Sequence, residues 1–114
     1  MFSIKRKLHR TVGPRRNFVR ILAHNLIMGG TIETTDARAK TIRPIMEKLV
    51  TIARRGRLQD LRLLLSRLPK DAASKLYYEI APKYKERKGG YLRILKLGNM
   101  RRRDAAKTAT ISFI

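Results

Sequence analysis

Apolar residues recur every three or four positions along most of the first 80 residues, a spacing typical of helices that bury one face. It predicts four helices: residues 14–28, 36–55 and 58–68, and a fourth that follows Asp71 and ends near Pro82, with one further turn at 83–87. In the first helix, Phe18, Leu22 and Leu26 form the stripe that we expect in the core. The leucines between positions 58 and 68 form the corresponding stripe of the third.

Shorter segments rich in β-branched residues predict three strands, Thr31–Thr34, Tyr91–Leu97 and Thr108–Ile114. We expect the second strand to be buried, with Leu92 and Ile94 on one face. A basic loop joins it to the third strand, which predicts a hairpin with a long tip. The order α-β-α-α-α-β-β predicts an α+β fold: a small two-layer domain over residues 14–114, about four helices packed on a three-stranded sheet. A basic N-terminal arm, residues 1–13, precedes it.

Glycine, proline and capping residues mark the predicted boundaries. Gly29-Gly30 ends the first helix. Thr34-Thr35-Asp36 supplies an N-cap and a first-turn carboxylate for the second helix, and Asp71 is the predicted cap of the fourth. Pro44 lies inside the second helix, where proline removes a backbone donor and crowds the preceding turn, so we expect a kink there.

The net charge of the chain indicates what kind of partner it binds. The chain has 28 Lys and Arg against 8 Asp and Glu in 114 residues, a net charge of +20. The net charge is +7 over residues 1–32, +5 over 33–82 and +8 over 83–114. Self-repulsion of this size opposes compaction and implies a polyanionic partner. RNA or DNA is the first interpretation, and an anionic membrane surface is the second.

Several other classes of protein fit this composition poorly. The absence of cysteine excludes disulfides, thiolate metal sites and cysteine nucleophiles. The longest apolar runs have three residues, too few to span a membrane. The acid-free, basic start resembles an organelle transit peptide in composition, but it equally suits an RNA-binding arm that orders on its partner, or a solvated tail.

Catalytic chemistry is not indicated. The eight acidic residues are scattered singly, without the clustering that two-metal catalysis needs. His9 and His24 have no partners at metal-ligand spacing, and there is no nucleophile–base pattern or phosphate loop. We therefore predict no catalytic residue, no metal site, no cofactor and no small-molecule substrate.

The candidate RNA-binding residues lie on the arm, on one stripe of the first helix and in the two loops that flank the second strand. They are Lys5, Arg6, Lys7, His9, Arg10, Arg15, Arg16, Arg20, His24, Arg87, Lys88, Gly89, Gly90, Tyr91, Arg93, Arg101, Arg102 and Arg103. No acidic residue lies near the Arg16–His24 stripe in the sequence, which favours phosphate contact over a solvated face. Gly89-Gly90 can adopt backbone angles that are closed to other residues.

This distribution of charge suits a folded RNA, recognised by its shape and phosphates, better than the groove of a regular duplex. The sequence has no zinc-finger ligands, no basic zipper and no paired aromatic platform. A DNA-compacting or architectural protein is the alternative. A membrane-surface module is the third interpretation, which Pro44 and Gly56 disfavour because they interrupt any continuous amphipathic helix.

Six short segments then form a recognisable series. They are Arg6–Thr11, Thr34–Lys40, Glu47–Thr51, Ile80–Tyr84, Gly89–Lys96 and Asp104–Ala106. Their order and spacing, more than any one of them, resemble the bacterial large-subunit ribosomal protein family numbered seventeen, over about Lys5 to Ile114.

The resemblance implies a small α/β domain that is a structural constituent of the large ribosomal subunit. It implies binding to large-subunit ribosomal RNA, beside neighbouring ribosomal proteins near the exit of the nascent-chain tunnel. The family's basic arm corresponds to Lys5–Arg10, and its Gly-Gly-Tyr-Thr-Arg segment to Gly89–Arg93, with Leu92 in place of threonine. Departures at Met1–Ile4, Pro44 and Arg103 suggest a divergent bacterial or an organellar member, which we expect on a ribosome of the bacterial cytoplasm or an organelle matrix.

Overall fold

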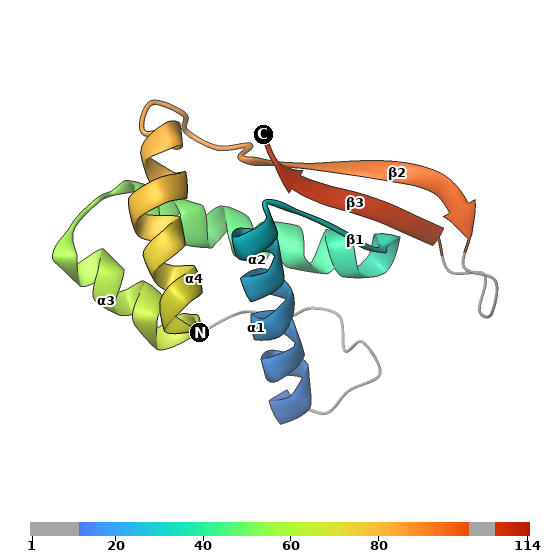
Figure 1. The fold of residues 1–114 in the computed structure, drawn as a ribbon, viewed down its shortest axis with the longest axis horizontal. Coiled ribbons are helices and arrows are strands. Elements are labelled where there is room, and N and C mark those ends of the chain that lie inside the picture. The colour runs from blue at the N-terminus through green and yellow to red at the C-terminus, as the bar shows by residue number, and fades with distance from the viewer. Residues whose placement is uncertain (1–11, 101–106) are drawn as a thin grey trace.

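The computed structural model describes the backbone of residues 12–100 and 107–114 and the side chains of residues 16–97 and 107–114. The described part is an α+β fold of four helices and a three-stranded antiparallel sheet (Figure 1). Its elements follow the predicted order α-β-α-α-α-β-β, so the predicted fold class is confirmed. The predictions made for residues 1–11 and 101–106 lie outside the described residues.

Helix α1 (Val12–Gly29) begins two residues before its predicted start and ends at the predicted glycines. Gly30 has a φ of 79°, the left-handed region that glycine adopts without strain. Its N–H donates to the Leu26 carbonyl oxygen at 2.8 Å, which closes the helix before strand β1 (Thr31–Thr35).

The buried face of α1 differs from the predicted stripe. Phe18 and Leu22 are half-buried, and the guanidinium of Arg38 lies 5.0 Å from the centre of the Phe18 ring. A strict four-residue spacing drifts around a helix of about 3.6 residues per turn, so the core takes a mixed three-and-four pattern. Among residues 16–29 of α1, whose side chains the structure describes, the fully buried ones are Val19, Ala23, Leu26 and Ile27.

Helix α2 (Asp36–Arg54) begins as the sequence predicts. The Thr35 hydroxyl accepts a hydrogen bond from the Arg38 N–H at 3.3 Å, and Asp36 pairs with Lys40 at 3.0 Å. The helix continues through Pro44, whose side chain is exposed, and the kink expected there stays a prediction. The buried face consists of Ala39, Ile42, Ile45, Met46, Leu49, Val50 and Ala53.

Helix α3 (Leu58–Arg67) follows Gly56, whose φ is 72°. The predicted leucine stripe is wrong in part, because Leu64 and Leu68 are buried whereas Leu58 and Leu65 are 62% and 40% exposed. A ten-residue helix packed on one side can bury only part of such a stripe.

The fourth predicted helix is three elements. Helix α4 (Lys70–Lys75) continues into a π-helical turn (Leu76–Ile80) and a 3₁₀ turn (Ala81–Tyr84). The prediction that Asp71 is the N-cap of this helix is wrong. The helix begins at Lys70, and Pro69 occupies the N-cap position. Pro82 has no N–H to donate, which favours the change of helix type at this end.

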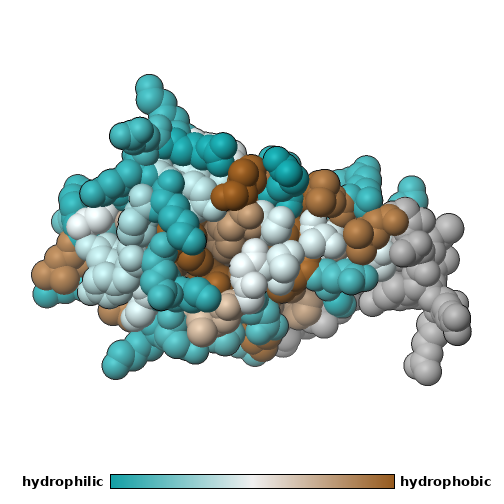
Figure 2. Space-filling model, turned by 45° about the horizontal axis from the view of Figure 1, so that its top comes forward, coloured by the Kyte–Doolittle hydropathy of each residue, from teal (hydrophilic) through white to brown (hydrophobic). Residues whose placement is uncertain are grey.

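Strands β2 (Leu92–Met100) and β3 (Lys107–Phe113) form the predicted antiparallel hairpin. The order in the sheet is β1-β3-β2, so β2 is an edge strand and the prediction of a buried strand is wrong. Leu92 is buried and Ile94 half-buried, whereas Arg93 and Leu95 are exposed. Figure 2 shows hydrophobic side chains, in brown, interrupting the hydrophilic surface on this face of the molecule.

Helix α2 holds the fold together. It contacts all three strands, and α1 and α3 pack against it, while α4 packs on α1 and α3. In Figure 1 α2 runs along the sheet, with the other helices grouped around it. Its buried side chains meet Leu92, Ala109 and Ile111 of the sheet in one hydrophobic core.

An ion pair between His24 and Asp71 links α1 to α4. His24 Nε2 lies 3.0 Å from Asp71 Oδ2. The hydrogen bond with Asp71 raises the pKa of His24 above its ordinary value, and the hydrogen bond with His24 lowers the pKa of Asp71.

We predict that Leu64→Ala lowers the free energy of unfolding by about 2–5 kcal/mol, because it leaves a cavity in the core. Leu65→Ala, the next residue on the same helix but an exposed one, should cost less than about 1 kcal/mol. Urea denaturation of both variants measures the difference. Equal losses would contradict the described face of α3.

We predict that the His24–Asp71 pair makes stability depend on pH. A raised histidine pKa gives stability that is fully present below the unfolded value of 6.5 and is lost as pH rises through the folded value. The lowered pKa of Asp71 gives stability present above its unfolded value of 3.8 and lost as pH falls through the folded one. Relative to His24→Gln, the wild type should therefore lose melting temperature as the pH rises from 6.5 through the raised pKa of His24. Parallel melting curves across that interval would refute the pair's role.

Candidate nucleic-acid interface

The sequence-predicted site residues divide into three groups. Lys5, Arg6, Lys7, His9, Arg10, Arg101, Arg102 and Arg103 lie outside the described residues, as does the side chain of Arg15. Arg16, Arg20 and His24 lie on α1, and Arg87–Arg93 form the loop and the first residues of β2. Figure 1 places the first turns of α1 and this loop at opposite ends of the molecule, so the structure does not bring the two described groups together.

The basic stripe of α1 is less uniform than expected. Arg16 and Arg20 are exposed, as a phosphate contact requires. His24 instead pairs with Asp71, so the premise that no carboxylate lies near this stripe is wrong. The two residues are 47 positions apart in the sequence, and only folding makes them neighbours.

The loop from Arg87 to Gly90 is exposed, but Tyr91 is not. The Tyr91 side chain has 0% exposure, its ring lies 5.3 Å from that of Tyr84, and its hydroxyl donates to the Arg87 carbonyl oxygen at 3.1 Å. The ring therefore belongs to the core, and the RNA contact expected of Tyr91 stays a prediction. Burial also raises the pKa of Tyr84, whose hydroxyl donates to the Ile114 carbonyl oxygen at 2.7 Å.

Gly90 is the glycine whose freedom the loop uses. Its φ is 67°, and a Cβ added there would meet no atom within 4 Å, so the constraint is backbone strain and not space. The turn at Gly90 lets the backbone pass from the exposed loop to the buried Tyr91 in a single step along the chain.

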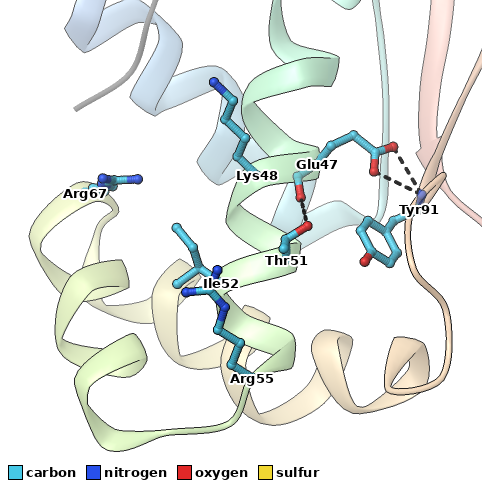
Figure 3. Close-up of a pocket in the computed structure, with 8 residues that line it drawn as sticks. Glu47, Lys48, Thr51, Ile52, Arg55, Arg67 and Tyr91 are labelled. Carbon is cyan, nitrogen blue, oxygen red and sulfur yellow. Dashed lines mark hydrogen bonds between the residues drawn. The ribbon is translucent and has the colours of Figure 1, made fainter.

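Glu47 of α2 fixes the end of this loop. Its carboxylate accepts hydrogen bonds from the Tyr91 N–H at 3.1 and 3.2 Å (Figure 3). It also accepts one from the Leu92 N–H at 3.2 Å. Arg54, also from α2, donates to the carbonyl oxygen of Arg87. Charged side chains of one helix therefore hold both ends of a cationic loop in place.

Two hollows open on either side of Glu47. The first, which we call the Lys48 hollow, has a volume of about 390 Å³. It is lined by Glu47, Lys48, Thr51, Ile52, Arg55, Arg67, Gly89 and Tyr91, most of which Figure 3 shows around it. The second, the Arg43 hollow, has a volume of about 450 Å³ and is lined by Lys40, Arg43, Pro44, Glu47, Gly90 and Ile94.

We call the bases that line these hollows the basic face, defined by Lys40, Arg43, Lys48, Arg55 and Arg67. None of them is among the residues predicted from the sequence. The available signal was the polar side of the long helix, where cations recur opposite the apolar positions. The sequence does not show that the Gly89-Gly90 loop folds onto this side.

Several acidic residues of the described part are occupied internally. Asp60 is buried and accepts from the Arg57 guanidinium at 2.9 and 3.3 Å, which lowers the pKa of Asp60. The hydrogen bond from Lys40 lowers the pKa of Asp36. Glu47 is held by backbone amides. Neutralisation within the described chain is therefore small relative to its charge, and the exposed cations carry a positive field.

The arrangement is suited to binding phosphate. Arginine and lysine heads on two helices and a loop can contact several phosphates of a folded polynucleotide at once. Among the described residues there is no group of three or more side chains able to hold a metal ion. That part of the chain also lacks a helix with the length and apolar character needed to span a membrane.

Comparison with known proteins agrees with this chemistry. The family model for ribosomal protein L17 matches residues 18–114. The large ribosomal subunit protein bL17 of Hydrogenobaculum sp. is 41% identical over 111 residues, which cover 96% of this chain and 94% of the relative. The protein of that name from Thermoanaerobacter pseudethanolicus is 46% identical over 110 residues, covering 96% and 97%. That of Sphingopyxis alaskensis is 47% identical over 110 residues, covering 96% and 78%.

The match to the family model extends from within α1 to the end of β3, including the segments that build the basic face. Matches of this identity over nearly the full length confirm the resemblance found in the sequence: the chain belongs to the ribosomal protein L17 family.

Proposed function

We propose that this protein binds large-subunit ribosomal RNA through the basic face, the Arg87–Gly90 loop and the exposed arginines of α1. As a member of the ribosomal protein L17 family, it is a structural constituent of the large ribosomal subunit and not an enzyme. The relatives named above are bacterial, which supports the bacterial ribosome as its place of action.

The observation that carries the proposal is the convergence of cations around Glu47. Five bases from α2, α3 and the residue after α2 surround two hollows, and the loop with Arg87 and Lys88 adjoins them. The 28 basic residues of the chain far exceed its 8 acidic ones. The phosphates of a folded RNA supply the missing negative charge.

The shape of this surface favours folded RNA over a regular duplex. The cations are distributed over helix faces and a loop around two hollows, and not along one helix that could enter a groove. The arm, Lys5–Arg10, and the tip, Arg101–Arg103, extend the proposal to the remaining predicted contacts. The position near the tunnel exit, beside other ribosomal proteins, rests on the family resemblance.

We predict a steep dependence of RNA affinity on salt. With about ten phosphate contacts, the log–log slope of the binding constant against salt concentration should lie near −7 to −9. Filter binding to a transcript of the large-subunit ribosomal RNA measures it, with duplex DNA of equal length as competitor. A slope shallower than about −3, or equal binding to the DNA, would contradict the proposal.

We predict that Glu47→Ala weakens RNA binding although it removes a negative charge from the interface. Charge alone would strengthen binding, whereas loss of the carboxylate releases the Tyr91 and Leu92 amides and the loop that they position. Glu79→Ala, an exposed acid elsewhere, is the control with the same change in charge and should bind slightly more tightly. Titration with the same transcript, on variants checked for folding by circular dichroism, decides the sign. If both substitutions increased RNA affinity equally, Glu47 would have no role in positioning the interface.

A further inference from the structure

The Lys48 hollow has features that generic phosphate binding does not require. Its volume of about 390 Å³ falls within the range of about 300–1,000 Å³ of small-ligand sites, and it exceeds what one phosphate fills. Three cationic residues line it, Lys48 from α2, Arg67 from α3 and Arg55 from the residue after α2.

The floor of the hollow is of another kind. Ile52 is half-buried and offers apolar surface there, the Thr51 hydroxyl donates to the Glu47 carbonyl oxygen at 2.9 Å, and Tyr91, which also lines the hollow, is buried. Gly89 has no side chain to narrow the mouth, and a Cβ added there would meet no atom within 4 Å. Cationic heads above an apolar floor suit a ligand with one charged part and one flat apolar part.

The cations of the hollow are available for a ligand. Within residues 12–100 and 107–114, neither Lys48 nor Arg67 forms an ion pair. Arg55 reaches Asp60 only at 4.0 Å, and that carboxylate is already bound by Arg57 at 2.9 Å. Figure 3 shows Lys48, Arg55 and Arg67 around the same opening.

We propose that the Lys48 hollow receives one unpaired nucleotide extruded from the bound RNA. Its base lies on the Ile52 floor, and its phosphate contacts Lys48, Arg55 and Arg67. Unpaired nucleotides expose the faces and edges that proteins read in RNA, whereas paired ones do not. This inference rests on the proposed RNA-binding function. It adds the recognition of one unpaired nucleotide, which contacts between cations and phosphates alone do not provide.

Because the chain has no cysteine, a single introduced thiol can carry a crosslinker at a chosen place. Lys48→Cys and Arg62→Cys each remove one positive charge, and Arg62 is a base of α3 outside the hollow. Each variant, labelled with a short photo-crosslinker, is bound to the large-subunit ribosomal RNA transcript and irradiated. The inference predicts that the Lys48→Cys variant crosslinks to one unpaired nucleotide and that the Arg62→Cys variant does not.

A matched pair of double variants tests the energetics. Lys48→Gln/Arg67→Gln removes two charges from the hollow, and Arg62→Gln/Lys70→Gln removes two charges outside it. The hollow variant should make the salt slope shallower by about 1.4 to 1.8, because two phosphate contacts are lost, whereas the control variant should leave the slope nearly unchanged. The hollow variant should lose about tenfold more affinity than the control variant, because without these contacts to its phosphate the extruded nucleotide no longer stays in the hollow. The nucleotide that crosslinks in the Lys48→Cys variant should then regain reactivity toward chemical probes.

The outcomes separate the two claims. If the wild type does not bind the transcript with a steep salt dependence, the proposed function fails and the inference fails with it. The inference alone is overturned, and the proposed function stands, if the wild type binds but the Lys48→Cys variant crosslinks to paired segments. Equal losses of affinity in the two double variants would have the same meaning.

Discussion

The contact between one carboxylate and two backbone amides determines how this protein presents its charge. Glu47 projects from α2, the helix that packs on the sheet, and accepts from the Tyr91 and Leu92 amides at the start of β2. A buried or half-buried amide without an acceptor is costly, so the loop before Tyr91 has a defined path. That path places Gly89 and Gly90 beside the bases of α2 and creates the two hollows of the basic face.

Three aspartates of the described part serve similar local ends. Asp36, Asp60 and Asp71 each hold a neighbouring base or a backbone amide, and none of them forms a surface that would repel a polyanion. The fold thus uses acidic residues to position its elements and leaves basic residues facing outward. A chain with a net charge of +20 is expected to gain stability from its polyanionic partner, and the ribosomal RNA is that partner in the proposed function.

Local signals in the sequence predicted the local structure well. The cap at Thr35, the stop at Gly30 and the hairpin of β2 and β3 all follow from residues within a few positions of one another. What the sequence missed at the candidate site has a common cause, which is contact between distant parts of the chain. His24 meets Asp71, 47 residues away, and Glu47 meets Tyr91, 44 residues away. No local pattern reports such contacts, so the pairing of His24, the burial of Tyr91 and the folding of the Gly89-Gly90 loop onto the polar side of α2 were not predictable.

The central claim is that the cations around Glu47 face ribosomal RNA. A cryo-electron microscopy map of the large ribosomal subunit that contains this chain tests it most directly. The account predicts that the heads of Lys48, Arg55 and Arg67 lie within salt-bridge distance of RNA phosphates, with the Arg87–Gly90 loop in contact with the same RNA. A map in which these side chains face solvent or another polypeptide, with no RNA within reach, would contradict it.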